Sequence, residues 1–134
     1  MYLRRLSQPA KEVFIEIAKY LCNADGIVDK REEKLLAAYG EELQMSISLD
    51  LPKKSLEALA MDLNAATDRI QKRIVVFELM GLALVDGNYA DEEKAFFKLL
   101  GKKLDLRPTF TERCEASIRE YMAVQKKIDE LIFG

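Results

Sequence analysis

The 134-residue sequence contains no histidine, no tryptophan, only two cysteines and only three prolines. Without histidine, the chain lacks the usual general base of enzymes and the commonest ligand of transition metals. No serine or cysteine therefore has an imidazole partner to activate it. Cys22 and Cys114 are not spaced as a CxxC motif, so the sequence indicates neither a redox motif nor a disulfide framework.

The sequence also lacks a glycine-rich phosphate loop and any long apolar run. The longest apolar stretch, residues 74–85, is broken by Glu78 and is too short to span a bilayer. The basic N-terminal residues are not followed by the apolar region of a signal peptide. We therefore expect a cytoplasmic protein that does not insert into a membrane. The net charge of −2 and the pI near 5.3 predict no nucleic-acid partner.

Helix-forming residues dominate the composition, and no segment alternates between apolar and polar residues with a period of two. Hydrophobic residues make up 49% and charged residues 33%, which is the balance of a folded protein. The length fits one domain with a substantial core. We predict an all-α fold: a single domain over residues 1–134, built as a helical bundle of about six helices.

The most informative pattern is a repeat with an offset of 61 residues, over units of approximately 11–45 and 72–106. Each unit has an apolar helical stripe that ends in Asp-Gly, a Glu six residues after the Gly, and a second apolar stripe. The pattern predicts two helical hairpins related by a pseudo-two-fold axis. The identical pairs are Lys11 and Lys72, Leu21 and Leu82, Asp25 and Asp86, Gly26 and Gly87, Glu32 and Glu93, Gly40 and Gly101, and Leu43 and Leu104.

Capping signals place the helix starts. The apolar positions of the fourth helix run nearly all round its C-terminal half, which predicts the central buried helix of the domain. The start signals are Ser7-Gln8-Pro9 for the first helix, Asp29 to Glu32 for the second, Leu51-Pro52 for the third, Thr67-Asp68 for the fourth, Asp91 to Glu93 for the fifth, and Thr109 to Glu112 for the last.

The repeated carboxylates are the candidate site. Asp-Gly-x5-Glu is the second half of an EF-hand calcium loop, but Leu21 and Leu82 occupy loop position 1, which excludes a standard EF-hand. Two interpretations stay open: structural capping of the turns and helices, or a looser site for Ca²⁺ or Mg²⁺. The candidate metal ligands are Asp25, Asp29, Glu32, Asp86, Asp91 and Glu93.

Three further features have a structural interpretation. Glu78 interrupts the apolar run of the fourth helix, and we expect it to mark an exposed edge of that helix. Cys22 is expected to be a small core residue. A basic strip on the fifth helix is expected to be a solvated face, with a weaker alternative as a patch for an anion or an acidic partner. The strip contains Lys98, Lys102, Lys103 and Arg107.

The two hairpins, at residues 24–32 and 85–93 above all, resemble the TerB-like domain family, which is named for tellurite-resistance protein B. The likeness covers about residues 9–132. It implies an all-helical fold with internal two-fold pseudosymmetry, a metal at the acidic hairpins, and a bacterial stress-response or scaffold role. The family's acidic positions carry over to Asp25, Glu32, Asp86 and Glu93. The two loops are not equivalent, because Asp29 has Ala90 as its counterpart.

The predicted function is that of a non-enzymatic binding or scaffold module with a protein partner. The alternative is a metal-dependent enzyme in which the same carboxylates hold a cation that polarises a phosphate-containing substrate. A third interpretation makes the carboxylates pure capping groups and places the partner surface elsewhere, for example on the last helix. That helix carries apolar residues from Cys114 and Ile118 to Ile128 and Ile132. The sequence does not predict the oligomeric state.

Overall fold

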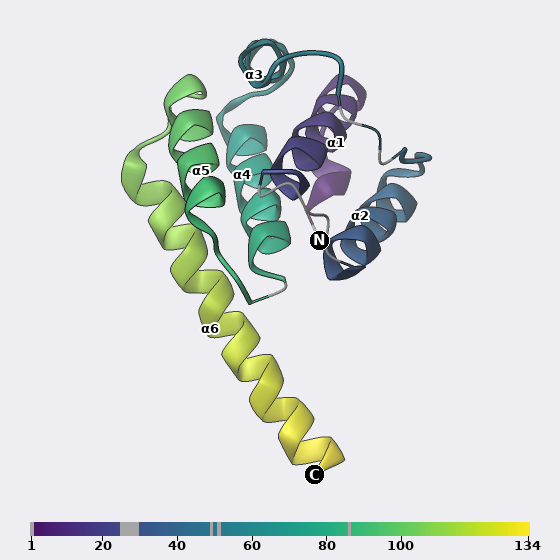
Figure 1. Cartoon of the computed structure of the whole chain (residues 1–134), viewed down its shortest axis with the longest axis vertical. Coiled ribbons are helices and arrows are strands. Elements are labelled where there is room, and N and C mark those ends of the chain that lie inside the picture. The colour runs from purple at the N-terminus through teal and green to yellow at the C-terminus, as the bar shows by residue number, and fades with distance from the viewer. Residues whose placement is uncertain (1, 25–29, 49, 51, 86) are drawn as a thin grey trace.

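The computed structural model describes residues 2–24, 30–48, 50, 52–85 and 87–134. These residues form six α-helices and one 3-10 helix and contain no strand, which confirms the predicted all-α fold. Five helices and the first half of the sixth pack together, and the rest of the sixth projects from the domain (Figure 1). The elements are η1 (Leu3–Arg5), α1 (Gln8–Cys22), α2 (Lys30–Leu43), α3 (Leu56–Ala66), α4 (Arg69–Leu84), α5 (Asp91–Lys103) and α6 (Pro108–Phe133).

The 61-residue repeat is present in the helix starts. Helices α1 and α4 begin 61 residues apart, and so do α2 and α5. The N-cap residues of the first pair are Ser7 and Asp68, and the side chain of each accepts a hydrogen bond from the backbone N–H three residues later. Two different polar residues thus satisfy the same orphan donor of a first helical turn.

The ends of α2 and α5 also match across the repeat. Gln44 and Asp105, 61 residues apart, both have a left-handed φ of 57°. In each case the following residue, Met45 or Leu106, donates its N–H to the carbonyl of the glycine five residues earlier, at 2.8 and 2.9 Å. These are Schellman motifs, in which one left-handed residue stops the helix and satisfies its last carbonyl groups. The same local stop is therefore built twice.

Helix α4 is the centre of the domain, as its apolar pattern predicts. It contacts η1, α1, α2, α5 and α6. The short helix η1, which the sequence pattern did not predict, contacts α4 and α2, and both Leu3 within it and Leu6 directly after it are buried. Because η1 has only three residues, it is too short to show helical periodicity in the sequence.

Two helix starts differ from the prediction. Helix α3 begins at Leu56 instead of at Leu51-Pro52, because the hydroxyl of Ser55 accepts the Ala58 N–H and caps the helix there. Helix α6 begins at Pro108, a residue suited to the first position because it has no N–H to leave unsatisfied. The predicted cap at Thr109 is therefore wrong.

Helix α6 has two different halves. Its first half packs on α4 and α5 and buries Cys114 and Ile118. From residue 119 to the end, every residue is exposed, and this part extends beyond the rest of the domain (Figure 1). Among the described residues, no helix is long and apolar enough to cross a membrane.

Candidate functional site

The predicted acidic ligands divide into two groups. Asp25, Asp29 and Asp86 lie outside the described residues. Glu32 and Glu93 occupy the third position of α2 and α5, and each has only 5–6% of its surface exposed. Asp91, by contrast, has a side chain that is 98% exposed and lies 3.9 Å from the ammonium of Lys94. Within the described part of the chain, no three Cys, Asp or Glu side chains gather as metal ligands.

Glu93 has a structural function at the start of α5. Its Oε1 accepts a hydrogen bond of 3.0 Å from the backbone N–H of Ala90, the N-cap residue. This is one half of a capping box, since the alanine side chain has no acceptor for the reciprocal bond. The capping interpretation of the repeated glutamates is therefore supported at Glu93.

A substitution at Glu93 tests capping against metal binding. We expect Glu93→Ala to lower the free energy of unfolding by about 1 kcal/mol, because a partly buried N–H loses its acceptor. Glu93→Gln should cost less, since its amide oxygen still accepts. Urea denaturation with EDTA, and again with added Ca²⁺ or Mg²⁺, should give the same losses. A loss that appears only with the cation would instead make Glu93 a ligand.

The prediction for Glu78 is wrong, because only 6% of this residue is exposed. Its Oε1 accepts a 3.0 Å hydrogen bond from the backbone N–H of Tyr2, and its backbone carbonyl accepts one of 3.0 Å from the Tyr39 hydroxyl. Burial, and then the carboxylates of Glu78 and Glu42, raises the pKa of the Tyr39 hydroxyl well above its ordinary value. The N-terminal segment packs over the edge of α4 that carries Glu78, which the sequence pattern had predicted to be exposed.

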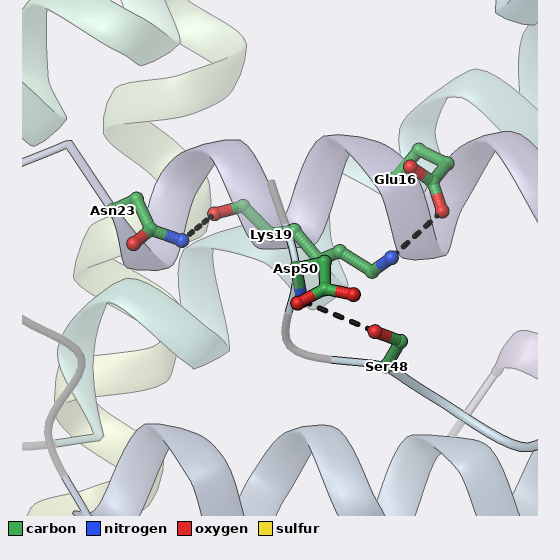
Figure 2. A network of polar contacts seen from close by, with 5 residues as sticks. All are labelled: Glu16, Lys19, Asn23, Ser48 and Asp50. Atoms are coloured by element: carbon green, nitrogen blue, oxygen red, sulfur yellow. Dashed lines mark hydrogen bonds and ion pairs between the residues drawn. The ribbon is translucent and has the colours of Figure 1, made fainter. Parts of the chain in front are cut away.

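Sequence reasoning did not single out Lys19, which is also buried. Its ammonium lies 2.9 Å from Oε1 of Glu16, one turn earlier on α1, and its carbonyl accepts a 2.8 Å bond from the Asn23 side chain (Figure 2). The Glu16-x-x-Lys19 spacing is the only sequence signal for the ion pair between these two residues.

In the connector after α2, the hydroxyl of Ser48 accepts the Asp50 N–H at 3.2 Å (Figure 2).

Both cysteines are buried and free of disulfides, which confirms the core interpretation of Cys22. Burial raises the pKa of the Cys114 thiol to about 11. A thiol with such a pKa carries almost no thiolate at neutral pH, so Cys114 is not suited to nucleophilic chemistry.

A cavity of about 440 Å³ lies where the first turns of α4, the connection between α5 and α6, and the first turns of α6 meet. We call it the basic cavity, because five of its lining residues are cationic and only Asp105 is acidic. Its cationic residues are Arg69, Lys72, Arg73, Arg107 and Arg113, and its apolar ones are Leu104, Leu106 and Phe110.

The tertiary structure brings these cations together from three parts of the chain. The left-handed Asp105 turns the chain out of α5, and Pro108 then starts α6 across the beginning of α4. The guanidinium of Arg73 lies 5.5 Å from the centroid of the Phe110 ring, a cation–π contact between the two helices. In a chain with a net charge of −2, the basic cavity is a local concentration of positive charge.

A second cavity of about 700 Å³ lies between α5 and α6. Three members of the predicted basic strip, Lys98, Lys102 and Arg107, line it, whereas Lys103 does not. Glu112 and Glu115 of α6 line the same cavity and offset its positive charge. The strip therefore does not form one uniform anion site, and the stronger candidate is the basic cavity.

Sequence reasoning missed Arg69, Arg73 and Arg113 as a group. Arg69 and Arg73 are one helical turn apart, which gives a local signal, but Arg113 lies 40 residues later in the chain. Only the contact between α4 and α6 places it beside them.

A scan against models of known protein families found no match to this chain, and searches of curated proteins and of solved structures found no similar protein.

Proposed function

We propose that the chain is a TerB-like binding module without catalytic chemistry of its own, and that it holds an acidic group of a protein partner in the basic cavity. The observation that carries the proposal is the set of five cationic side chains on one cavity, opposed by the single carboxylate of Asp105. Like-charged side chains repel one another, so such a set is most stable when an anion lies among them.

The arginines fit a carboxylate or a phosphate on a partner's side chain. A guanidinium donates two parallel hydrogen bonds to such a group, and four of the five cations of the basic cavity are arginines. Phe110 and the two leucines supply apolar surface beside the charges, which suits the side chains that flank an acidic residue in a peptide. Nucleic acid is a poorer fit, because its regular phosphate array needs an extended basic surface.

The proposal predicts charge-dependent peptide binding. A fluorescein-labelled peptide of alternating Glu and Leu, and the same peptide with Gln for Glu, would be titrated with the protein and followed by anisotropy. We expect the Glu peptide to bind and the Gln peptide to bind at least tenfold more weakly. The Arg73→Gln, Arg113→Gln double variant should weaken Glu-peptide binding about tenfold, at roughly 0.7 kcal/mol for each exposed charge contact.

A matched control removes the same charge elsewhere. Lys126→Gln, Lys127→Gln changes two exposed cations on the projecting half of α6, far along the helix from the cavity, and should alter the affinity less than twofold. Inorganic pyrophosphate should displace the peptide, and affinity should fall as salt rises. Equal weakening by both double variants would show that only net charge matters and would refute the basic cavity as the site.

The other predicted functions rest on the acidic loops. A Ca²⁺ or Mg²⁺ site, and a metal-dependent enzyme acting on a phosphate-containing substrate, both stay predictions that depend on Asp25, Asp29 and Asp86. The hydrogen bond from Ala90 to Glu93 supports the capping interpretation at one of the six positions and favours a binding module over the enzyme. A bacterial cytoplasmic setting and a role in stress response are part of the TerB-like proposal.

A further inference from the structure

The projecting half of α6 exposes a large apolar surface. Leu131 and Phe133 are 84–85% exposed, and no other helix of the described chain has such a run of exposed apolar side chains. Figure 1 shows this part of α6 extending alone beyond the domain. The exposed large apolar residues here are Tyr121, Met122, Val124, Ile128, Leu131, Ile132 and Phe133.

The apolar side chains continue the face by which α6 packs on its own domain. The buried Cys114 and Ile118 begin a series with alternating steps of four and three residues, which is the heptad spacing of a coiled coil. The series, which we call the α6 stripe, continues through Tyr121, Gln125, Ile128 and Ile132, with Val124 and Leu131 along one edge. The opposite side of the helix carries Arg119, Glu120, Lys126, Lys127 and Glu130.

We infer that the exposed part of the α6 stripe is covered by the same part of α6 from a second copy of this chain, in antiparallel orientation. At about 100 Å² for each large side chain, the five apolar residues of the exposed stripe supply about 500 Å² per chain, and Met122 and Phe133 beside them bring the exposed apolar surface to about 700 Å². A specific dimer buries about 600–1,000 Å² on each partner. The exposed apolar surface of this part of α6 therefore falls within the range of a specific dimer interface.

The position of the domain on the stripe decides the orientation. In each chain the domain already covers the stripe at Cys114 and Ile118. A parallel partner helix would continue along that covered part and collide with the domain. An antiparallel partner covers only the exposed part, and its own domain then lies beyond Phe133 of the first chain. The second helix thus continues the packing that the domain of the first chain begins.

The antiparallel register pairs the apolar residues with one another. Centred between residues 126 and 127, it places Tyr121 opposite Ile132 of the second copy. Val124 and Leu131 occupy equivalent edge positions of the heptad, and such positions flank each other across an antiparallel pair, so Val124 lies next to Leu131 of the second copy. Gln125, the one polar member of the stripe, lies opposite Ile128 of the second copy. Its side-chain amide donates a 3.2 Å hydrogen bond to Asp129 of its own helix, so burial does not remove that bond.

Charge favours a second copy over an anionic membrane surface. Residues 119–133 carry three cations and three carboxylates: Arg119, Lys126 and Lys127 against Glu120, Asp129 and Glu130. Two such neutral segments do not repel each other. A helix that lies on an anionic lipid surface instead has a polar face rich in lysine and arginine.

Sedimentation equilibrium of the intact chain tests the dimer. We expect a monomer–dimer equilibrium with a Kd on the order of micromolar. Ile128→Glu, Leu131→Glu should raise that Kd at least about 100-fold, because four charges would enter the apolar interface. The control Ala116→Glu, Ala123→Glu adds the same charge to the opposite side of α6 and should change the Kd less than about threefold. Circular dichroism should show all three proteins equally helical.

Cross-linking tests the orientation. Chains with Val124→Cys and chains with Leu131→Cys would be mixed and oxidised, while the native cysteines stay buried in the domain. The antiparallel register predicts that the mixed disulfide dominates over the two symmetric ones.

A monomer at all concentrations up to about 200 µM, far above the expected micromolar Kd, would overturn the inference. So would a dimer that survives Ile128→Glu, Leu131→Glu, a dominant 124–124 cross-link, or a monomer that binds phosphatidylglycerol vesicles through the stripe. Variants of the basic cavity should leave dimerisation unchanged, so the two proposals fail separately.

Discussion

Glu78→Ala should lower the free energy of unfolding by about 2–4 kcal/mol, although the sequence pattern placed Glu78 on an exposed edge. The substitution removes a carboxylate that accepts a 3.0 Å hydrogen bond from the Tyr2 N–H, and bonds to a charged acceptor contribute about 1.5–3 kcal/mol. It also leaves a void beside the buried central helix, which adds further cost. Urea denaturation at pH 7 measures the loss.

Glu78→Ala should also weaken the packing of the N-terminal segment. The hydrogen bond from Tyr2 holds the segment that contains η1 against α4, and this segment includes the buried Leu3 and Leu6. We therefore expect limited proteolysis to cut this segment faster in Glu78→Ala. Glu78→Gln keeps an acceptor of nearly the same shape and should cost less than about 1 kcal/mol. If Gln proved as costly as Ala, the charge and not the hydrogen bond to Tyr2 would explain the stability.

The two equivalent glycines of the repeat should respond to alanine with opposite signs. Gly40→Ala should lower the free energy of unfolding by about 1–3 kcal/mol. A Cβ at position 40 would lie 2.8 Å from the backbone oxygen of Met45 and 3.0 Å from the Ile47 side chain. The isoleucine can turn away, but the backbone carbonyl is that of Met45, whose N–H closes the stop of α2, so this residue cannot shift without weakening the stop.

Gly101→Ala should instead raise the free energy of unfolding by about 0.5–1 kcal/mol. Its new Cβ would meet only the methyl group of Thr111 at 3.9 Å, an ordinary van der Waals distance, so the higher helix propensity of alanine remains as the net effect. Thermal and urea denaturation of the two single variants give a direct comparison. A loss of stability in both would mean that the two helix ends are more alike than their surroundings indicate.

These glycines show how far a repeat can be interpreted from sequence. The 61-residue offset predicted that Gly40 and Gly101 are equivalent, and the shared Schellman motif agrees with that prediction. The difference between them comes from the chain that follows. After Met45 the side chain of Ile47 lies against Gly40 of α2, whereas after Leu106 the chain leaves to start α6 at Pro108. A local sequence pattern does not determine the path that the chain takes after the helix has ended.

The acidic site shows a different limit. The pattern identified Glu32 and Glu93 as equivalent, and both are buried at the same helical position. Whether a carboxylate caps a helix or binds a cation depends on which groups face it in space. At Glu93 the acceptor is used by the N–H of Ala90, a contact that the sequence allowed but did not require.

The sequence alone was enough to predict the six α-helices and the 61-residue offset between them. Caps such as Ser7 and Asp68 and apolar spacings of three and four residues act over a few positions of the chain, so they can be recognised without a structure. The tertiary structure alone decided the burial of Glu78, the basic cavity and the exposed end of α6. Each of these depends on which distant segment covers a given face: η1 covers Glu78, α6 brings Arg113 to α4, and no described segment of the chain covers the α6 stripe beyond Ile118. Helical periodicity predicts that a face is apolar, but long-range packing determines what lies against it.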